Sequence, residues 1–278
     1  MKIPRYAPGE DPGPSFVELL RQSGLNPATP TVPVENVTHA TTCVALRYAD
    51  GVIMAGDRRA TSGHLISHRT MEKVYPADRF SGVAIAGAAG PAMEMVKLFQ
   101  LQLEHYEKVE GNFLSLEGKA NQLGQMVRSN LPAAMQGLAV VPLFAGFDLR
   151  RDEGRLFQYD VTGGRYEESN FASTGSGSLH AGTVIKLGYR STLDRAEGID
   201  LVISALFQAA DEDSATGGPD LVRGIYPTIA TITRGGFERV PEDEIAERFR
   251  LLADRLATPD GVADVGIAPT ADGGERNS

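Results

Sequence analysis

The chain has 278 residues, enough for one large domain or two small ones, and its 42% hydrophobic and 23% charged residues are typical of a globular protein. Its formal net charge of −9 argues against nucleic acid or an anionic membrane as its main partner. The single cysteine, Cys43, excludes an intrachain disulfide and fits a reducing compartment. Because the N-terminus lacks the apolar core of a secretory signal and no apolar run approaches the length of a membrane span, we expect a cytosolic protein.

Residues 1–40 differ in composition from the rest, because seven prolines interrupt any long element there. One short helix is predicted, since Ser15 and Glu18 form an S-x-x-E capping box ahead of apolar residues and Gly24 would end it. Its apolar stripe suggests that the segment docks on another surface.

From Thr41 onward the pattern changes to strands. The runs "TTCVALRY" and "GVIMAG" are separated by Asp50-Gly51, which predicts a hairpin. Both runs are apolar at successive residues, which indicates a sheet covered on both faces. The segments "HLISHRT", "KVYPA" and "GVAIAG" are further strand candidates.

The rest of the chain alternates helix pairs with strands. One helix is expected to begin with Pro91 at its first position and a second near Ser115. The strands "LAVVPLFAGFD" and "GRLFQYD" follow, then helices at about 178–189 and 199–210, a hairpin of "YPTIATIT" and "FERV", and a charged helix at about 242–257. Paired helices argue against a βαβ parallel sheet and favour an α+β fold, with two packed antiparallel sheets and a helix pair on each outer face. The residues after Thr258 are expected to be disordered.

Common catalytic motifs are absent. The Gly-rich stretch at 174–182 has His180 where G-x-G-x-x-G needs glycine, and it also fails G-x-S-x-G. No P-loop occurs, and the five histidines and one cysteine make no zinc motif.

Threonine is the remaining candidate nucleophile. A threonine hydroxyl inside a chain lacks a base, but the free α-amine of an N-terminal threonine can serve as that base. The pKa of such an amine is near 8 in model peptides, so its neutral form is accessible at neutral pH. The chemistry also needs a nearby cation, a carboxylate to hold that cation, and backbone N–H groups to bind the oxyanion.

Five segments of the chain, taken together in their order and spacing, are more specific than any single motif. The segments "TTCVALRYADGVIMAGDRRAT", "MEKVY", "AIAGAAG", "GSGS" and "DSATGG" resemble the catalytic β subunits of the 20S proteasome. The segments "QLEHYEKVEG", "AAMQGLAVVPL" and "DEDSATGGPDLVRGIYPT" are most similar to the actinobacterial branch. The resemblance covers residues 41–257 and implies the four-layer αββα sandwich of the N-terminal-nucleophile hydrolases. It makes 1–40 a propeptide, 41–257 the catalytic domain and 258–278 a tail.

The resemblance also assigns roles to residues. The family's nucleophile and free amine fall on Thr41, the carboxylate that holds its lysine on Asp57, and the lysine itself on Lys73. The oxyanion-binding backbone N–H falls on Gly87. The outer polar group that orders the amine and a water falls on Ser176, Asp213 and Thr216, where the family often has serine at the last position. Singly, each has an ordinary structural interpretation: a turn, a solvated charge or a helix end.

Thr42 competes with Thr41 as the nucleophile. Asp57 and Lys73 lie 16 and 32 residues after Thr41, which matches the family spacing. A shift of one residue on a strand would send the side chain to the opposite face, so Thr41 is favoured. Cys43 is expected to be a small buried apolar residue.

Three further expectations follow from the resemblance. The family usually has glycine before the cleaved bond, whereas this chain has Ala40, which leaves the processing rate open. The positions that line the first specificity pocket hold Ala60, Met71, Ile85 and Ala89, so large hydrophobic residues are expected before the cut bond. Thr61, with Gly87 and Ala89, is expected to pair through its backbone with an extended peptide.

The resemblance therefore implies a threonine endopeptidase without metal or organic cofactor. It implies β rings flanked by rings of α subunits in an α7β7β7α7 particle, and an ATPase ring that delivers tagged proteins. Two alternatives remain: the shorter two-ring bacterial peptidase related to proteasomes, which lacks the "DSATGG" block, and an unprocessed structural ring subunit, which Ala40 favours. An α subunit is disfavoured, because α subunits lack the processed threonine.

Overall fold

The computed structural model of the chain describes residues 41–62 and 64–257. Three expected features lie outside the described residues: the short helix between Ser15 and Gly24, the residue Ala40, and the tail after Thr258. Within the described ranges, no helix is long and apolar enough to cross a membrane.

The first sheet is built around the strand that follows Thr41. It has five antiparallel strands in the order β10-β1-β2-β11-β12. A two-residue turn joins β1 to β2, with Tyr48 opposite Gly51. Residues 42–46 are buried without alternation, so the sheet is covered on both faces, as predicted. The strands are β1 (Thr42–Tyr48), β2 (Gly51–Gly56), β10 (Phe171–Gly175), β11 (Thr228–Thr233) and β12 (Gly236–Arg239).

The second sheet has five antiparallel strands in the order β5-β6-β7-β8-β9. They are β5 (Val74–Asp78), β6 (Ser81–Gly87), β7 (Val140–Asp148), β8 (Glu153–Tyr159) and β9 (Arg165–Glu168). A separate two-stranded hairpin, β3 (Ala60–Ser62) with β4 (Leu65–His68), leaves the first sheet just after β2.

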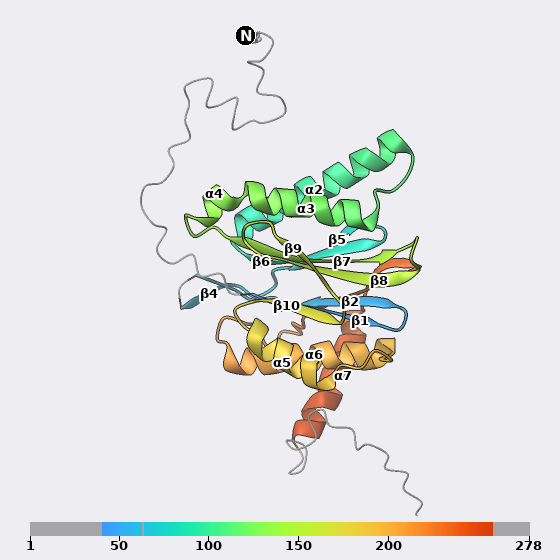
Figure 1. The fold of residues 1–278 in the computed structure, drawn as a ribbon. Helices are drawn as coiled ribbons and strands as arrows, with labels where there is room; N and C mark the ends of the chain where they lie inside the picture. Colours follow the sequence, from blue (N-terminus) through green and yellow to red (C-terminus); the bar gives the residue numbers. More distant parts are fainter. Residues whose placement is uncertain (1–40, 63, 258–278) are drawn as a thin grey trace, which may run out of the picture. The chain divides into compact units, whose positions relative to one another are not determined.

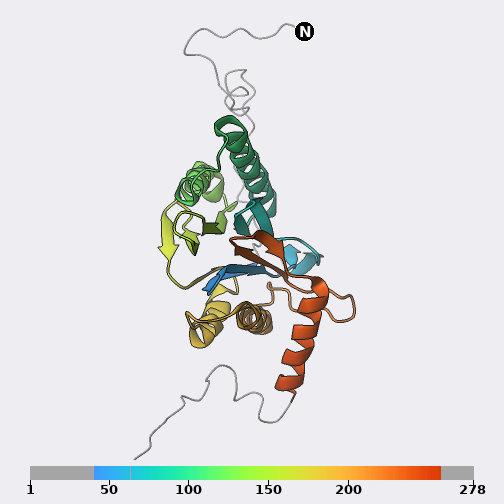
Figure 2. The ribbon, with the colours of Figure 1, turned by 90° about the vertical axis from the view of Figure 1, so that its right-hand side faces the viewer.

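Helices cover the outer face of each sheet (Figure 1). Helices α2 (Ala89–Glu110) and α3 (Leu116–Ser129) pack on the second sheet, and α5 (Ser178–Gly188) and α6 (Arg195–Glu212) pack on the first. Helix α7 (Glu242–Leu256) lies beside the α5–α6 pair (Figure 2), and α4 (Leu131–Ala134) is a single turn after α3. The predicted four-layer αββα sandwich of two antiparallel sheets is confirmed.

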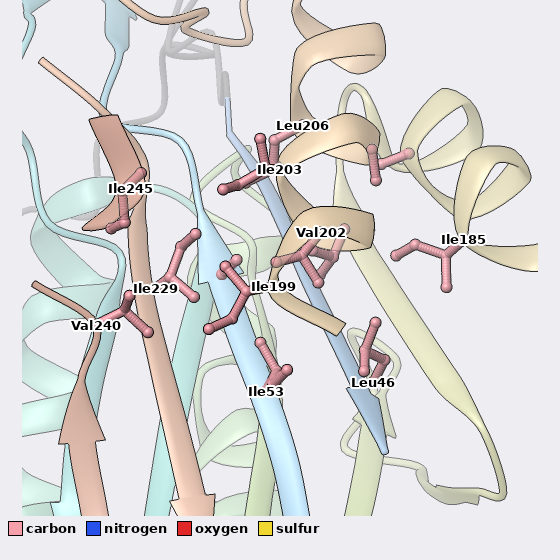
Figure 3. Close-up of a cluster of buried hydrophobic side chains, with 14 of the residues drawn as sticks. Leu46, Ile53, Ile185, Ile199, Val202, Ile203, Leu206, Ile229, Val240 and Ile245 are labelled. Atoms are coloured by element: carbon pink, nitrogen blue, oxygen red, sulfur yellow. The ribbon is translucent and has the colours of Figure 1, made fainter. Parts of the chain in front are cut away.

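Three apolar clusters join the four layers. On β1, Val44 and Leu46 face the helices, whereas Cys43 and Ala45 face the other sheet, because successive strand residues point to opposite faces. Figure 3 shows the cluster beneath α6, where branched aliphatic side chains from the sheet, α5, α6 and α7 meet; its labelled members include Leu46, Ile53, Ile185, Ile199, Val202, Leu206, Ile229 and Ile245. The middle cluster between the sheets holds Cys43 and Met54 against Leu143 and Leu156.

Some helix boundaries differ from the sequence expectation. Helix α2 begins at Ala89, so Pro91 is its third residue rather than its first; no intrahelical N–H bond is needed at either position. Helix α6 begins at Arg195, before the expected 199, because Asp194 and Glu197 form a complete capping box. Strands β9 and β10 were not predicted; both are short, and their apolar residues are few.

Candidate active site

Asp57 lies at the end of β2, where the first sheet gives way to the β3–β4 hairpin. Its side chain is fully buried. Oδ1 accepts hydrogen bonds from the Thr42 backbone N–H at 2.8 Å and from Lys73 Nζ at 2.7 Å. Oδ2 accepts from the backbone N–H groups of Arg59 at 2.9 Å and Gly217 at 2.8 Å. Four donors from separate segments therefore satisfy and orient one buried carboxylate.

Lys73 comes from the other sheet, one residue before β5. Its side chain is 1% exposed, and its Nζ also donates to the Arg59 carbonyl at 2.6 Å. The Lys73 carbonyl accepts from the Ile85 N–H at 2.9 Å, which ties its backbone to β6. The ion pair with Asp57 thus joins the two sheets at the start of β1, with the charges paired as burial requires.

Thr41 immediately precedes β1 and is 5% exposed. Its carbonyl accepts from the Ser176 backbone N–H at 2.9 Å, and the next residue donates from its backbone to Asp57. Thr41 is therefore fixed between the Asp57–Lys73 pair on one side and the loop between β10 and α5 on the other. The sequence-predicted residues Thr41, Asp57 and Lys73 are brought together.

Thr42 points the opposite way and is fully buried. Its Oγ1 accepts from the Gly177 N–H at 3.0 Å and lies 2.6 Å from Thr216 Oγ1. This hydroxyl is engaged inside the protein, toward the side of the sheet that α5 and α6 cover. The placement favours Thr41 over Thr42 as the candidate nucleophile, in agreement with the spacing argument.

Asp213 ends α6 and gathers a second polar cluster. Its Oδ2 accepts from Ser176 Oγ at 2.5 Å and from Thr216 Oγ1 at 2.6 Å, and Oδ1 accepts from the Ala215 N–H at 3.1 Å. Partial burial acts to raise the pKa of Asp213, but the bonds from Ser176, Thr216 and the Ala215 backbone outweigh it and hold that pKa below its usual value. The three residues predicted as one polar group are therefore joined through the Asp213 carboxylate.

Gly87 closes β6 with a φ of +117°, a conformation that favours glycine. A Cβ atom at this position would lie 2.1 Å from the Ala139 carbonyl oxygen. The next N–H, from Ala88, donates to that same oxygen at 2.8 Å. Glycine is thus required where the strand turns into α2, at the position predicted to supply the oxyanion contact.

The predicted specificity residues lie in four segments of the chain: β3, the connection between β4 and β5, β6 and α2. Ala60 and Thr61 lie in β3, Met71 donates its N–H to the Arg58 carbonyl at 3.0 Å, and Ala89 begins α2. Ile85 is only 3% exposed and packs in the core beneath α2 and α3. Of the five, only Ile85 belongs to one of the three apolar core clusters.

A cavity of about 350 Å³ adjoins the Asp57 cluster through Arg59 and Gly217. Arg58 and Arg69 also line it, together with residues 217–222 and 225–227. None of the five predicted specificity residues lines this cavity.

Cys43 is fully buried in the middle cluster, as expected, and burial raises the pKa of its thiol to about 12. Its Sγ lies 3.5 Å from the Ile85 carbonyl. Across residues 41–62 and 64–257, no group of three or more His, Cys, Asp or Glu side chains is arranged to hold a metal ion.

Several residues of the site were missed by sequence reasoning. Arg59 contributes its backbone, Gly177 and Gly217 contribute N–H groups, and the Thr42 hydroxyl joins the Asp213 cluster. The glycines could have been suspected from "GSGS" and "DSATGG", where glycine permits close backbone approach. Arg59 could not have been suspected in this way, because a backbone N–H or carbonyl contributes no signal in the sequence.

Comparison with known proteins identifies the family of the chain. The family model described as "Proteasome subunit" matches residues 37–222. The chain is 56% identical over 254 residues to a proteasome subunit beta of Acidimicrobium ferrooxidans, covering 89% of this chain and 92% of that protein. It is 58% identical over 224 residues to a proteasome subunit beta of Streptomyces griseus, covering 80% of each chain. With the family matched over most of the chain and identity above half, the chain belongs to the proteasome subunit family, and to its β subunits.

Proposed function

We propose that this chain is a threonine-type endopeptidase, with Thr41 as its nucleophile once residues 1–40 are removed. Membership of the β subunits makes it a peptidase component that assembles into proteasome rings with other subunits. The observation that carries the finer proposal is the buried Asp57 carboxylate, which holds Lys73 and the Thr42 backbone beside Thr41.

The proposed reaction begins at the Thr41 hydroxyl. The free amine of Thr41 takes the hydroxyl proton, and Lys73, held by Asp57, favours the neutral amine through its positive charge. Oγ1 attacks the peptide carbonyl, and the backbone N–H of Gly87 stabilises the oxyanion. The amine then protonates the leaving nitrogen, giving a threonyl ester that water hydrolyses with help from Ser176, Asp213 and Thr216.

The proposed propeptide removal uses the same nucleophile. Thr41 Oγ1 attacks the carbonyl of Ala40, and the Ala40–Thr41 amide bond breaks as the Thr41 nitrogen gains the proton that the hydroxyl loses and becomes the free amine. Water then hydrolyses the resulting ester to release residues 1–40. We propose that 41–257 is the mature catalytic domain and 258–278 a tail.

The proposed substrates are unfolded proteins cut after large hydrophobic residues. Ala60, Met71, Ile85 and Ala89 would form the apolar pocket for that residue, and Thr61 would pair with the extended peptide. The proposed setting is the cytoplasm, in an α7β7β7α7 particle with proteasome α subunits, fed by an ATPase ring that delivers tagged proteins.

The test is the intact mass of the chain after co-expression with its α subunit. Loss of residues 1–40 that Thr41→Ala abolishes supports Thr41 as a self-processing nucleophile. A cut before Thr42 contradicts the register. A full-length chain in an assembled, inactive particle supports the alternative of an unprocessed structural subunit, which Ala40 favours. Cleavage of fluorogenic peptides after Arg but not after Tyr or Leu contradicts the apolar pocket.

A further inference from the structure

The Thr42 hydroxyl belongs to a hydrogen-bond chain whose direction is fixed. Thr216 Oγ1 lies 2.6 Å from Asp213 Oδ2, and an ionised carboxylate only accepts, so the single hydroxyl proton of Thr216 points at Asp213. The proton between Thr216 and Thr42, 2.6 Å apart, must then come from Thr42.

Gly177 completes the chain at its other end. The Thr42 oxygen has used its proton on Thr216, and it accepts from the Gly177 N–H at 3.0 Å. The order is therefore Gly177 N–H to Thr42 Oγ1, to Thr216 Oγ1, to the Asp213 carboxylate. We call this sequence the Thr42 relay.

The relay is closely packed. Thr42, Gly177 and Thr216 are all buried. A Cβ atom on Gly177 would lie 2.5 Å from Thr42 Oγ1 and 2.7 Å from Thr216 Oγ1. Because the φ of Gly177 is −86°, its backbone needs no glycine, so the two relay oxygens, with Ala209 Cβ at 3.2 Å, are what exclude a side chain there.

Thr42 thereby touches both polar halves of the candidate site. Its backbone N–H donates to Asp57 Oδ1, the oxygen that also binds Lys73, while its side chain leads to Asp213. Its carbonyl accepts from the Asp57 N–H at 3.1 Å. Thr42 is therefore bonded directly to Asp57 and, through the Thr216 hydroxyl, to Asp213.

We infer that Thr42 is a positioning residue for the reaction proposed at Thr41: its hydroxyl holds the Asp57–Lys73 pair and the Asp213–Ser176–Thr216 group in register on the two sides of the nucleophile. The inference rests on the proposed function. It assigns the second threonine of the Thr-Thr pair a role in alignment, separate from nucleophilic attack.

The experiment compares variants in the assembled particle with its α subunit. Thr42→Val keeps the shape of the side chain and removes the hydroxyl, whereas Thr42→Ser keeps the hydroxyl. Thr174→Val is the matched control, because Thr174 is also buried, lies opposite Cys43 on the next strand, and loses a hydroxyl bond to the Val141 carbonyl outside the relay. Intact mass gives the fraction of chains that have been processed, and the turnover of each variant is divided by that fraction.

Misplacement of reacting groups by about 1 Å costs up to about 10²-fold in rate, so we expect Thr42→Val to lower kcat by about tenfold or more with KM nearly unchanged. Thr42→Ser should restore most of kcat, and Thr174→Val should retain it. Thr42→Val combined with Thr216→Val should lose little more than the worse single variant, because both break one relay.

The outcomes separate the two proposals. If the wild-type particle neither processes nor hydrolyses peptides, or Thr41→Ala stays active, the proposed function fails. If the wild type is active and Thr42→Val matches Thr174→Val, the positioning role is overturned while the proposed function stands. If Thr42→Val does not assemble, the positioning role is tested with Gly177→Ala and Thr216→Val. Each of these variants breaks the relay at another residue. Normal kcat in both variants overturns the inference.

Discussion

Lys73 and Asp57 form an ion pair that the fold closes off from solvent: Nζ lies 2.7 Å from Oδ1, and the side chains are 1% and 0% exposed. Lys73 precedes a strand of the second sheet and Asp57 follows a strand of the first, so the pair joins the sheets at the candidate nucleophile. Isolated charges are costly to bury, which makes each partner depend on the other.

Removing one charge should cost both stability and activity. Lys73→Met leaves Asp57 buried without its cation, and we expect a loss of about 3–5 kcal/mol in the free energy of unfolding and no peptide hydrolysis. The double variant Asp57→Asn with Lys73→Met removes both charges, so stability should partly return while hydrolysis does not. Thermal unfolding and fluorogenic peptide assays of the assembled particle measure the two effects. A double variant as unstable as Lys73→Met would show that unpaired charge is not the cause.

Arg155 organises a second charged cluster far along the chain from the candidate site. It is 3% exposed, stacks over Phe157, and binds Asp148 at 3.0 Å, Glu117 at 2.8 Å and Glu167 at 2.6 Å. We expect Arg155→Met to lose about 3 kcal/mol of stability, at the low end for buried pairs, because Glu117 and Glu167 remain in contact with water. Thermal or urea unfolding measures the loss. The exposed Arg151→Met is the control, with a change within about 0.5 kcal/mol.

The same cluster predicts a pH dependence. The hydrogen bond from Arg155 holds the pKa of Glu167 below its usual value of 4.5. A folded-state pKa below the unfolded one gives stability that is complete above the unfolded pKa and is lost as pH falls through the folded one. Between about pH 6 and pH 3, wild-type stability should therefore fall more steeply than that of Arg155→Met. Parallel curves would contradict the role of this pair.

Cys43 is expected to be unreactive in the folded protein. Burial raises the pKa of its thiol to about 12, and the thiolate is the reactive form, so alkylation near pH 8 should be negligible. Intact mass after iodoacetamide treatment should show no adduct in the native particle and one adduct after unfolding in guanidinium. An adduct formed at the native stage at the rate of a free thiol would contradict the burial of Cys43.

The sequence was most informative where a pattern repeats or a motif is fixed. Unbroken apolar runs in β1 and β2 predicted a sheet covered on both faces, and the family motifs named Thr41, Asp57 and Lys73, which the fold brings together. The Thr42 relay was missed, because it joins residues 174 positions apart through hydroxyls that carry no periodic signal. Helix α6 begins at Arg195, before the expected 199, because its first turn is set by the polar capping residues Asp194 and Glu197, which carry no apolar periodicity.

Gly87 offers the sharpest steric test of the candidate oxyanion position. Gly87→Ala would place a Cβ atom 2.1 Å from the Ala139 carbonyl oxygen at a φ of +117°, so the end of β6 must shift. We expect a loss of stability of at least about 1 kcal/mol, more than the usual gain from replacing a glycine, and a strong loss of peptide hydrolysis. Gly90→Ala is the matched control three residues later. It lies in α2 with nothing within 4 Å of its Cβ position, and should be neutral or stabilise by about 0.4–1 kcal/mol with hydrolysis unchanged. If Gly87→Ala hydrolyses peptides as Gly90→Ala does, the backbone at Gly87 is not needed in its present conformation and cannot be the oxyanion contact.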